Sequence, residues 1–496
     1  MNLRIKENFI LNIFLFIFLI VYLHTLYPAP GGRVNAGDSM KWQFIGKVFG
    51  TPHPTGYPLF IILSSLFARI PLPIQLFIKV NLISTIFAIL TLFFLYKTLR
   101  LLSLKIFPSL ISTSIFAFGE IFWSQATEAE VYTLNSFFIS LILYLLILWK
   151  VKKDEKALSL SIFFLILSLS NHITISLFFP SVLTFILSLS PKSLFQKRTI
   201  FYLIFSLFIL ILLYTFLILR SNSSIYSEFP IKNLKDFIYF ISGGEWKRSL
   251  GFFHLSSIKT GMIKFISSIP SNITIPSLIF FVLGIFNFFK DLRVFFLLFF
   301  STLLFLFFPL FYSIRDVEVN YIPLYFFIVI FISSGMDLLL GLKFSKPLKK
   351  FLSLLLLSIP VFLSISNYKE LKIEESYWGD WIKVVFSSFK RDTIFIPDYI
   401  NYDQDMALCY GVFGLDFIKK NNFVISEHFP CRERIIEDYL EGKEISLRGF
   451  KLKKNMKIVC FDEGIALELS KKYKVEKRVL SGKVKIPYFR ISIERD

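Results

Sequence analysis

Long apolar stretches alternate with short polar connections over most of the first 366 residues of the chain. Several of these stretches approach the roughly 20 residues that a helix needs to cross the hydrocarbon core of a bilayer. They lie at residues 8–26, 75–96, 106–119, 131–149, 158–170, 173–189, 199–219, 273–289, 294–312, 321–340 and 350–366. Because unpaired backbone groups cannot face lipid, each stretch is predicted to be a helix. The pattern predicts a polytopic α-helical membrane protein with about 11 transmembrane helices.

The pattern changes after about residue 380, where short mixed runs replace the long apolar ones. The runs "TIFIPD", "NFVISE", "KIVCFD" and "YFRISIE" are typical of strands, and "CRERIIEDYLEG" and "EGIALELSKKYK" have helical spacing. We therefore divide the chain into a transmembrane domain, residues 1–366, and a soluble α/β domain, residues 367–496. The second domain has no phosphate loop, metal-spaced Cys/His set or nucleophile elbow, so we expect an acceptor-side or scaffolding role. Its odd number of cysteines leaves the disulfide state open: Cys409, Cys431 and Cys460.

The net charge of +20 is concentrated in alternate connections between the apolar stretches. Lys and Arg dominate the connections near residues 97–105, 150–156, 192–198, 290–293 and 343–350. This is the positive-inside pattern, in which basic connections stay in the cytoplasm. It predicts a multi-pass protein of the cytoplasmic (inner) membrane, with the N-terminus cytoplasmic, the first stretch retained as an anchor and the C-terminal domain periplasmic or extracellular. The charge orients the chain among membrane lipids, and no nucleic-acid partner is expected.

The connections on the predicted outer side carry ionisable residues of both signs. Transporters place such groups near the bilayer midplane, at broken helices. Here the groups lie at helix ends on one side, which favours a site open to the outer aqueous face and the outer leaflet. The candidate site residues are Asp38, His53, Glu128, Glu130, His172, Arg220 and Asp316.

The first outer loop, residues 27–74, is predicted to contain two short helices that lie along the membrane surface. In "DSMKWQFIGKVFG" the apolar residues form a rough helical stripe, with Lys41 and Gln43 mostly away from it and Asp38 or Ser39 as the N-cap. The prolines of "TPHPTGYP" stiffen the turn that follows. The next run, "LFIILSSLFARI", is too short to span a bilayer, so it is predicted to be surface-lying or re-entrant.

Seven short segments between residues 37 and 325 form a characteristic series. They are "GDS" (37–39), "HPTGYPL" (53–59), "KVNLISTIFAIL" (79–90), "WSQATEAEVYTLNSFF" (123–138), "SLSNHIT" (168–174), "LRS" (219–221) and "RDVEVNYIPLY" (315–325). In this order they resemble the GT-C superfamily of polyprenyl-phosphate-dependent glycosyltransferases, and within it the protein O-mannosyltransferase-like branch. The resemblance implies the GT-C fold and an inverting hexosyltransferase. Such an enzyme would move a mannose-like hexose from a polyprenyl-phosphate-linked donor to a hydroxyl acceptor, such as Ser or Thr of an exported protein, outside the cytoplasmic membrane.

The sequence departs from that branch at two places. Where the branch commonly has Gly-Glu after its Asp-Ser, this chain has Met40 and Lys41. Where the branch has His-Pro-Pro, this chain has His-Pro-Thr. Asp38 is therefore the single carboxylate of the first outer loop, so this loop alone does not supply the two acids of a metal site.

Asp38 is the predicted catalytic base, because an acceptor hydroxyl needs a carboxylate close enough to take its proton in the transition state. Its position also matches the family pattern. The competing interpretation is that Asp38 only caps a helix. Glu130 is predicted as a second polar anchor, for the acceptor or for a divalent cation shared with Asp38. Glu128, two residues away, would face the site together with Glu130 in an extended segment but not on a helix.

Four further residues are predicted to bind substrate. Arg220 stands where a membrane helix emerges and suits a phosphate clamp, although interfacial Arg side chains also commonly snorkel to the membrane surface. His53 suits either a phosphate contact or a structural role fixed by its flanking prolines. The same structural alternative applies to His172 and Asp316.

Three other functions stay open at this point. The acceptor can be a lipopolysaccharide or another glycolipid instead of a protein. A lipid or sugar transporter is a second alternative, although the one-sided acids, the missing internal repeat and the large outer domain speak against it. A non-catalytic membrane scaffold is the third, and such a protein would not need Asp38.

Overall fold

The computed structural model describes most of the chain and divides it into two compact units. The described residues are 3–250, 255–389, 392–398, 400–415, 423–424, 432–447, 450–453 and 456–492. The first unit, here called the helical unit, comprises Met1–Leu26, Ser84–Thr215 and Gly243–Lys372. The second, here called the mixed unit, comprises Tyr27–Ile83, Phe216–Ser242 and Ile373–Asp496. Each unit is thus assembled from segments far apart in the sequence, and the boundary expected between residues 366 and 367 stays a prediction.

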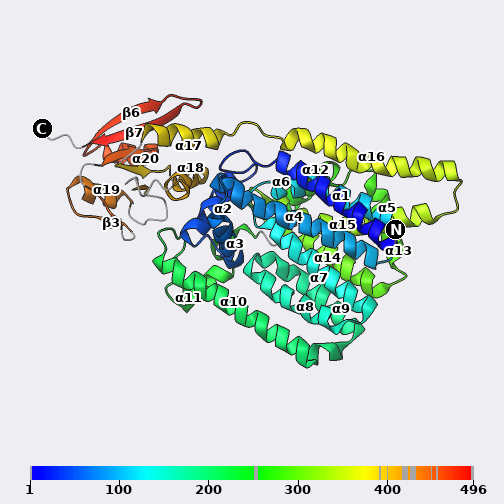
Figure 1. Cartoon of the computed structure of the whole chain (residues 1–496). Helices are drawn as coiled ribbons and strands as arrows, with labels where there is room; N and C mark the ends of the chain where they lie inside the picture. Colours follow the sequence, from blue (N-terminus) through cyan, green and yellow to red (C-terminus); the bar gives the residue numbers. More distant parts are fainter. Residues whose placement is uncertain are drawn as a thin grey trace. The chain divides into compact units, whose positions relative to one another are not determined.

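The helical unit contains most of the long apolar helices (Figure 1). Its α-helices are α1 (Leu3–His24), α4 (Leu76–Leu101), α5 (Ile106–Phe118), α6 (Glu120–Ala126), α7 (Tyr132–Lys152), α8 (Glu155–Leu167), α9 (Phe179–Leu189), α10 (Lys197–Ser223), α12 (Leu255–Asn272), α13 (Ser277–Phe288), α14 (Leu292–Leu310), α15 (Ile322–Gly341) and α16 (Lys346–Leu371). Helix α4 begins, and α10 ends, within the mixed unit. Every apolar stretch predicted from the sequence overlaps one of these helices, which confirms the class of α-helical membrane protein.

Seven described helices are long and apolar enough to cross a bilayer, or up to nine if two bent helix pairs count as one span each. The pairs are α5 with α6, bent by 68°, and α12 with α13, bent by 99°. The predicted number of 11 is not confirmed. One reason is that the stretches 158–170 and 173–189 form short helices on either side of the polar residues Asn171 and His172. Helices α1, α10 and α16 leave many Phe, Leu and Ile side chains exposed, as helices that face lipid do.

The mixed unit combines short helices with a small sheet. Its helices are α2 (Ala36–Val48), α3 (Pro58–Arg69), α11 (Leu234–Ile241), α17 (Tyr377–Ser388), α18 (Tyr402–Cys409), α19 (Arg432–Leu440) and α20 (Glu463–Leu469). Its strands are β1 (Thr393–Ile396), β2 (Phe423–Val424), β3 (Ser446–Leu447), β4 (Phe450–Lys451), β5 (Lys457–Cys460), β6 (Lys474–Leu480) and β7 (Ile486–Ser492). The main sheet has the order β2-β1-β5-β7-β6, with β1 parallel to β2 and β5, and β7 antiparallel to β5 and β6. The α/β character predicted for the C-terminal part is therefore confirmed.

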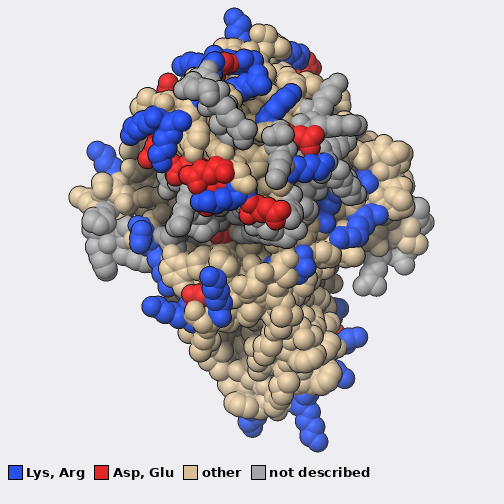
Figure 2. Space-filling view, turned by 90° about the vertical axis from the view of Figure 1, so that its left-hand side faces the viewer, with Lys and Arg blue, Asp and Glu red and all other residues tan. Residues whose placement is uncertain are grey.

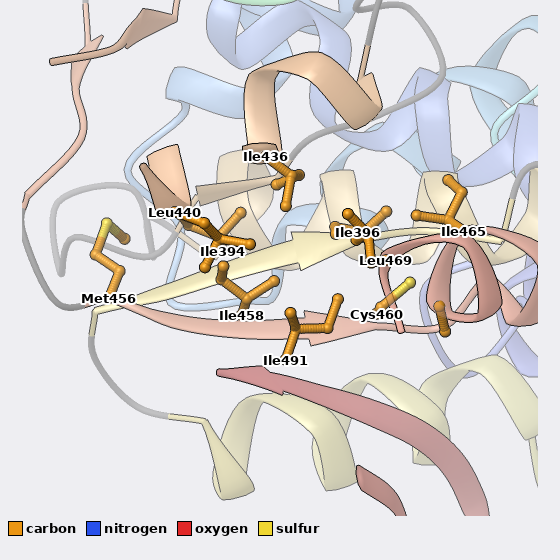
Figure 3. Packing of buried hydrophobic residues seen from close by; sticks show 11 residues of the cluster. Ile394, Ile396, Ile436, Leu440, Met456, Ile458, Cys460, Ile465, Leu469 and Ile491 are labelled. Atoms are coloured by element: carbon orange, nitrogen blue, oxygen red, sulfur yellow. The ribbon is translucent and has the colours of Figure 1, made fainter. Parts of the chain in front are cut away.

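The sheet of the mixed unit has its own apolar core (Figure 3). Ile394 of β1 pairs with Ile458 of β5, and both belong to one buried cluster with Ile436 of α19 and Ile465 of α20. Parallel strands that are buried on both faces consist of short, nearly continuous apolar runs. Such runs can be recognised in the sequence, and for this reason these strands were predicted. Strand β1 precedes α18 in the chain, and Asp398 lies between them. The Asp398 N–H donates to the side chain of Gln404 in α18 at 2.9 Å. The core therefore fixes the position at which α18 starts.

The surface of the C-terminal segment is charged but balanced. Figure 2 shows Lys and Arg side chains interspersed with Asp and Glu side chains on this part of the molecule. Exposed ion pairs such as Lys443–Asp438 and Lys472–Glu437 contribute little stability each, because water screens them. Such a mixed surface is typical of a soluble domain. Cys409 and Cys460 are buried beneath it, and Cys431 lies outside the described residues.

Helices α2 and α3 pack backbone to backbone at Gly46. A Cβ atom at this position would overlap the backbone nitrogen of Ser65 and lie 2.5 Å from the Ser64 hydroxyl oxygen. The same Ser64 hydroxyl donates to the carbonyl of Trp42 at 3.0 Å. Only a glycine permits this approach, and the approach holds α3 against the helix that carries Asp38.

Replacing Gly46 by Val is expected to destabilise the protein by about 1–3 kcal/mol or more, because backbone atoms cannot move aside for the new side chain. The apparent midpoint of thermal unfolding in detergent measures this effect. Gly341→Val is the matched control, since a Cβ there meets only the flexible end of Lys105 at 3.6 Å. Equal midpoints for the two variants would contradict the packing argument.

Candidate functional site

Asp38 lies in the first turn of α2 and is not its N-cap. The N-cap is Asn35, whose side-chain oxygen accepts the Asp38 N–H at 3.3 Å while its amide donates to Asp38 Oδ2 at 2.8 Å. The prediction of Asp38 or Ser39 as N-cap is therefore wrong, because Asn35 already serves the free N–H groups of the helix start. An acid in the first turn is favoured by the helix dipole. This position leaves the Asp38 carboxylate available for other contacts.

The largest departure from expectation is Lys41, which is completely buried. Its Nζ lies 2.6 Å from Asp38 Oδ1, 2.7 Å from the Tyr402 hydroxyl, 2.9 Å from His53 Nδ1 and 3.3 Å from Glu228 Oε1. The sequence placed Lys41 and Gln43 mostly away from the apolar stripe of a surface helix, and in the structure both side chains are buried because the helix is enclosed on that side as well. Buried charges in proteins require partners of this kind.

Gln43 is buried by a similar exchange of hydrogen bonds. Its side chain accepts from the N–H of Gly31 at 3.0 Å and donates to the Gly31 carbonyl at 3.1 Å. Its amide also donates to Asn81 Oδ1 at 3.0 Å. The polar residues of α2 therefore tie the helix into the protein.

Glu228 reaches the site from the segment that follows α10. The Thr51 N–H donates to the Tyr226 carbonyl at 3.1 Å, and the Glu228 N–H donates to the Thr51 carbonyl at 2.9 Å. This pairing places the Glu228 carboxylate next to Lys41, where the Tyr226 hydroxyl also donates to it at 2.7 Å. The sequence prediction missed Glu228; its only signal was that it is the one acid between residues 216 and 235.

Tyr402, at the first position of α18, also reaches the site. Its hydroxyl donates to Asp38 Oδ1 at 3.0 Å. The neighbouring Asp403 accepts the N–H of Gly37 at 2.8 Å, and a Cβ on Gly37 would lie 2.6 Å from the Tyr402 ring. The C-terminal part of the chain thus contributes a side chain to the cluster around Asp38.

The charges of this cluster support one another. Burial is the largest influence on the pKa of Asp38 and would raise it, but the surrounding charges and hydrogen bonds, led by the Lys41 ammonium, together hold the pKa below its usual range. Burial alone would lower the pKa of Lys41, but Asp38 and Glu228 outweigh it and hold the pKa above its usual range. Burial, followed by the negative charge of Asp38, raises the pKa of Tyr402 well above its ordinary value. At neutral pH Asp38 is therefore a carboxylate, Lys41 an ammonium and Tyr402 a neutral phenol.

One acceptor position of Asp38 is left over. A carboxylate offers about four lone-pair sites. Lys41 and Tyr402 use those of Oδ1, and within the described part of the chain Asn35 is the partner of Oδ2. The side chain of Asp38 is 19% exposed, and its role as the catalytic base stays a prediction.

His53 lies in the same cluster through Lys41. An ammonium group only donates hydrogen bonds, so Nδ1 of His53 accepts and the ring is the neutral tautomer with its proton on Nε2. The His53 ring also lies 5.9 Å from that of Trp42 and 5.4 Å from that of Tyr57, measured between centroids. The structure thus brings His53 and Asp38 into one cluster through Lys41.

Arg220 binds backbone carbonyl groups at the C-terminal end of α2. Its guanidinium donates to the carbonyl of Phe49 at 3.0 Å and to that of Val48 at 3.1 Å. Cationic side chains commonly satisfy the last carbonyls of a helix in this way. These contacts give Arg220 a structural role at the end of α2, and its role as a phosphate clamp stays a prediction.

The remaining predicted site residues belong to the helical unit. Glu128 and Glu130 are both buried in the turn between α6 and α7. Gln125 donates to Glu128 Oε1 at 2.9 Å, and the backbone of Glu130 exchanges two hydrogen bonds with the Ser84 hydroxyl. Buried carboxylates are uncommon in proteins, and substrate binding by Glu128 or Glu130 stays a prediction.

His172 and Asp316 occupy starts of short 3-10 helices in the helical unit. His172 is the N-cap of η2 (Ile173–Phe178), where its Nδ1 accepts the Thr174 N–H at 3.2 Å. Asp316 directly precedes η5 (Val317–Tyr321). Local capping gives His172 a structural role, and substrate binding by either residue stays a prediction.

Replacing Tyr402 by Phe is expected to cost about 1.5–3 kcal/mol, because one hydrogen bond to the Asp38 carboxylate and one from the Lys41 ammonium are lost while the ring stays in place. Both the thermal midpoint and the activity of the variant should fall. Tyr377→Phe, an exposed position on α17, should change neither. An unaltered Tyr402→Phe protein would contradict the described hydrogen bonds.

Comparison of the whole fold identifies its class. The chain has the fold of the GT-C membrane glycosyltransferases. ArnT from Cupriavidus metallidurans bound to undecaprenyl phosphate matches it with a TM-score of 0.58 over 96% of this chain and 97% of that chain. The Archaeoglobus fulgidus oligosaccharyltransferase in complex with Zn and sulfate matches with a TM-score of 0.50 over 96% of this chain and 72% of that chain. The sequence identities are 8% and 11%, so these similarities concern the fold alone.

A narrower similarity covers the first part of the chain. Residues 38–194 match the family model of the "Protein O-mannosyl-transferase TMEM260 N-terminal domain". The protein O-mannosyl-transferase tmem260 of Dictyostelium discoideum is 29% identical over 128 residues, or 25% of this chain and 15% of that protein. The mouse protein O-mannosyl-transferase TMEM260 is 29% identical over 155 residues, or 30% of this chain and 22% of that protein. The resemblance to the protein O-mannosyltransferase-like branch is confirmed, and the match spans less than a quarter of either relative.

Proposed function

We propose that this protein is a GT-C glycosyltransferase in which Asp38 is the catalytic base. The observation that carries the proposal is the Asp38 carboxylate itself. It is the first residue of the region that matches the O-mannosyl-transferase family, it is kept ionised by Lys41, and it retains one accessible lone pair. A general base needs these properties to remove a proton from an acceptor hydroxyl.

The proposed reaction is a direct displacement at the anomeric carbon of the donor sugar. The acceptor hydroxyl donates to Oδ2 of Asp38, and its oxygen forms the new bond to the anomeric carbon as its proton passes to the carboxylate. The bond between the anomeric carbon and the phosphate oxygen breaks, and its electron pair leaves with the polyprenyl phosphate. Because attack and departure occur on opposite faces, the configuration at the anomeric carbon is inverted.

The substrates are proposed from the comparisons. ArnT, which shares the fold, was seen bound to undecaprenyl phosphate, and this supports a polyprenyl-phosphate-linked donor. Relatives named protein O-mannosyl-transferases support a mannose-like hexose and a Ser or Thr acceptor on an exported protein. The basic connections support a site on the outer face of the cytoplasmic membrane, with the N-terminus inside. A glycolipid hydroxyl is the second acceptor class.

The other predicted residues are assigned to substrate binding. We assign His53 and Arg220 to the phosphate of the donor, since a cation or an N–H donor stabilises the charge that develops there. We assign Glu128, Glu130, His172 and Asp316 to the hydroxyl groups of sugar and acceptor. A carboxylate that binds a sugar hydroxyl would be sensitive to replacement by the matching amide, which provides a test for each acid.

The decisive experiment uses the purified full chain in detergent with polyprenyl-phosphate-linked mannose and a peptide rich in Ser and Thr. Peptide mass should increase by one hexose, and NMR of the product should show the inverted anomer. A glycolipid acceptor offered in parallel separates the two acceptor classes. If the chain moved donor lipid across a vesicle membrane without consuming it, the enzyme assignment would fail in favour of a transporter.

A further inference from the structure

The ammonium group of Lys41 has the surroundings of a bound cation. Two carboxylates, an imidazole nitrogen and a phenol oxygen surround Nζ at 2.6 to 3.3 Å. These groups belong to Asp38, His53, Glu228 and Tyr402, which lie in all three segments of the mixed unit. The side chain of Lys41 is fully buried, so water does not replace any of them.

The position beside Asp38 is filled by an ammonium group, and the distances around it are those of hydrogen bonds. Oxygen and nitrogen ligands lie about 2.0–2.3 Å from Zn²⁺, Mg²⁺ or Mn²⁺, whereas hydrogen bonds from an ammonium are about 2.7–3.2 Å long. A metal ion at Asp38 would also meet the positive charge of Lys41 within the same cluster. Among the described residues, no group of three or more His, Cys, Asp and Glu side chains is spaced to hold a metal. A divalent cation shared by Asp38 and Glu130 therefore does not fit the residues around Asp38.

We propose that Lys41 is a built-in cation that takes the place of a divalent metal ion beside Asp38, so that the site works without a metal ion. This proposal rests on the proposed function, because it assumes that Asp38 is the catalytic base of sugar transfer. It assigns Lys41 two tasks that a metal ion would otherwise have. The ammonium orients the Asp38 carboxylate, and it balances the charge of two acids that would repel each other and an incoming phosphate.

The proposal makes Lys41 a positioning residue, since it acts through Asp38 and His53. Its three protons are directed to Asp38, Tyr402 and His53, and this fixes the orientation of all three side chains. Lys47 lies on the same helix but donates to the carbonyl of Gly414 at 2.7 Å. Lys47 therefore serves as a matched control for the effect of removing a lysine from α2.

The primary test uses the unaltered full chain, stripped of metal with a chelator, in detergent. Mn²⁺ alone at millimolar concentration should not change the thermal midpoint in a way that depends on Asp38, so wild type and Asp38→Asn should respond alike. Sugar transfer should continue at the same rate in the presence of excess EDTA. A rise of the midpoint with Mn²⁺ that is lost in Asp38→Asn, or loss of transfer with EDTA that Mn²⁺ restores, would overturn the proposal.

A second test removes the ammonium group by replacing Lys41 with Ala. In Lys41→Ala, the groups of Asp38, Glu228 and His53 face an unfilled space and are free to move closer to an ion. Mn²⁺ should then raise the thermal midpoint of Lys41→Ala, and this rise should disappear when Asp38→Asn is added. Lys47→Ala should show no such response. If Lys41→Ala is folded and Mn²⁺ does not raise its thermal midpoint, the proposal that Lys41 occupies a cation position is wrong. If this variant does not fold, the measurements on the wild type still test the proposal.

These measurements separate the two proposals. If no sugar transfer is found under any condition, the proposed function fails, while the Mn²⁺ measurements on wild type and variants still test the role of Lys41. If transfer is found and requires a metal ion, the function stands and the built-in cation is wrong.

Discussion

Replacing Asp38 by Asn is expected to lower the rate of sugar transfer by about a hundredfold to ten-thousandfold, the range that a positioned general base contributes. The amide has the same shape as the carboxylate and keeps a hydrogen-bond acceptor, but it cannot take up the proton of the acceptor hydroxyl. The measurement is the initial rate of hexose transfer to a peptide, with donor binding determined separately. Binding of the donor should change much less than the rate.

The control for this variant is Asp236→Asn, the same replacement at a half-buried position in the first turn of α11, where the carboxylate accepts the N–H of Lys232 and, among the described residues, makes no contact with the Asp38 cluster. It should leave the rate unchanged. Thermal midpoints of both variants show whether the protein is folded, since Asp38→Asn also removes the ion pair with Lys41. A folded Asp38→Asn protein with full activity would show that Asp38 is not the catalytic base.

Replacing Lys41 by Met is expected to destabilise the protein by about 3–5 kcal/mol, because Asp38 and Glu228 are left as buried charges without their shared partner. Glu228 is only 7% exposed, so water gives it little compensation. The free energy can be measured from the shift of the unfolding transition in detergent. Lys47→Met, on the same helix, should cost much less.

The same variant should change the pH dependence of transfer. In the wild type the pKa of Asp38 lies below its ordinary value, so its stabilising charge is fully present above the pKa of the unfolded chain and is lost only as pH falls through the lower, folded value. Without Lys41, burial raises the pKa of Asp38, and Glu228 opposes its charge as well. The acid limb of the rate profile should therefore move to higher pH. A profile that stays in place would show that Lys41 does not act through Asp38.

The sequence predicts the fold well because the membrane imposes simple rules. Helices α1, α4, α7 and α10 follow from runs of apolar residues that must satisfy their backbone groups internally. Strands β1 and β5 follow from short apolar runs. Strand β6 was missed because its residues, such as Lys474, Glu476 and Lys477, are largely charged and exposed on the outer strand of the sheet.

The site is predicted only in part, and the reason is the distance between its members along the chain. Asp38 and His53 were found because they stand in a polar loop between apolar stretches. Glu228 and Tyr402 were not found, since a lone acid and a lone tyrosine have no periodic pattern that marks them. The burial of Lys41 was not predicted, because a helical stripe shows which residues are apolar but not which polar residues have buried partners.

The contact between Gly37 and Tyr402 has a consequence for biosynthesis. Asp38 and Tyr402 are separated by 364 positions, so the ribosome must add nearly three quarters of the chain after Asp38 before its hydroxyl partner exists. A nascent chain therefore carries an Asp38 without its full set of hydrogen bonds, and the completed cluster appears only when the last part of the protein has folded.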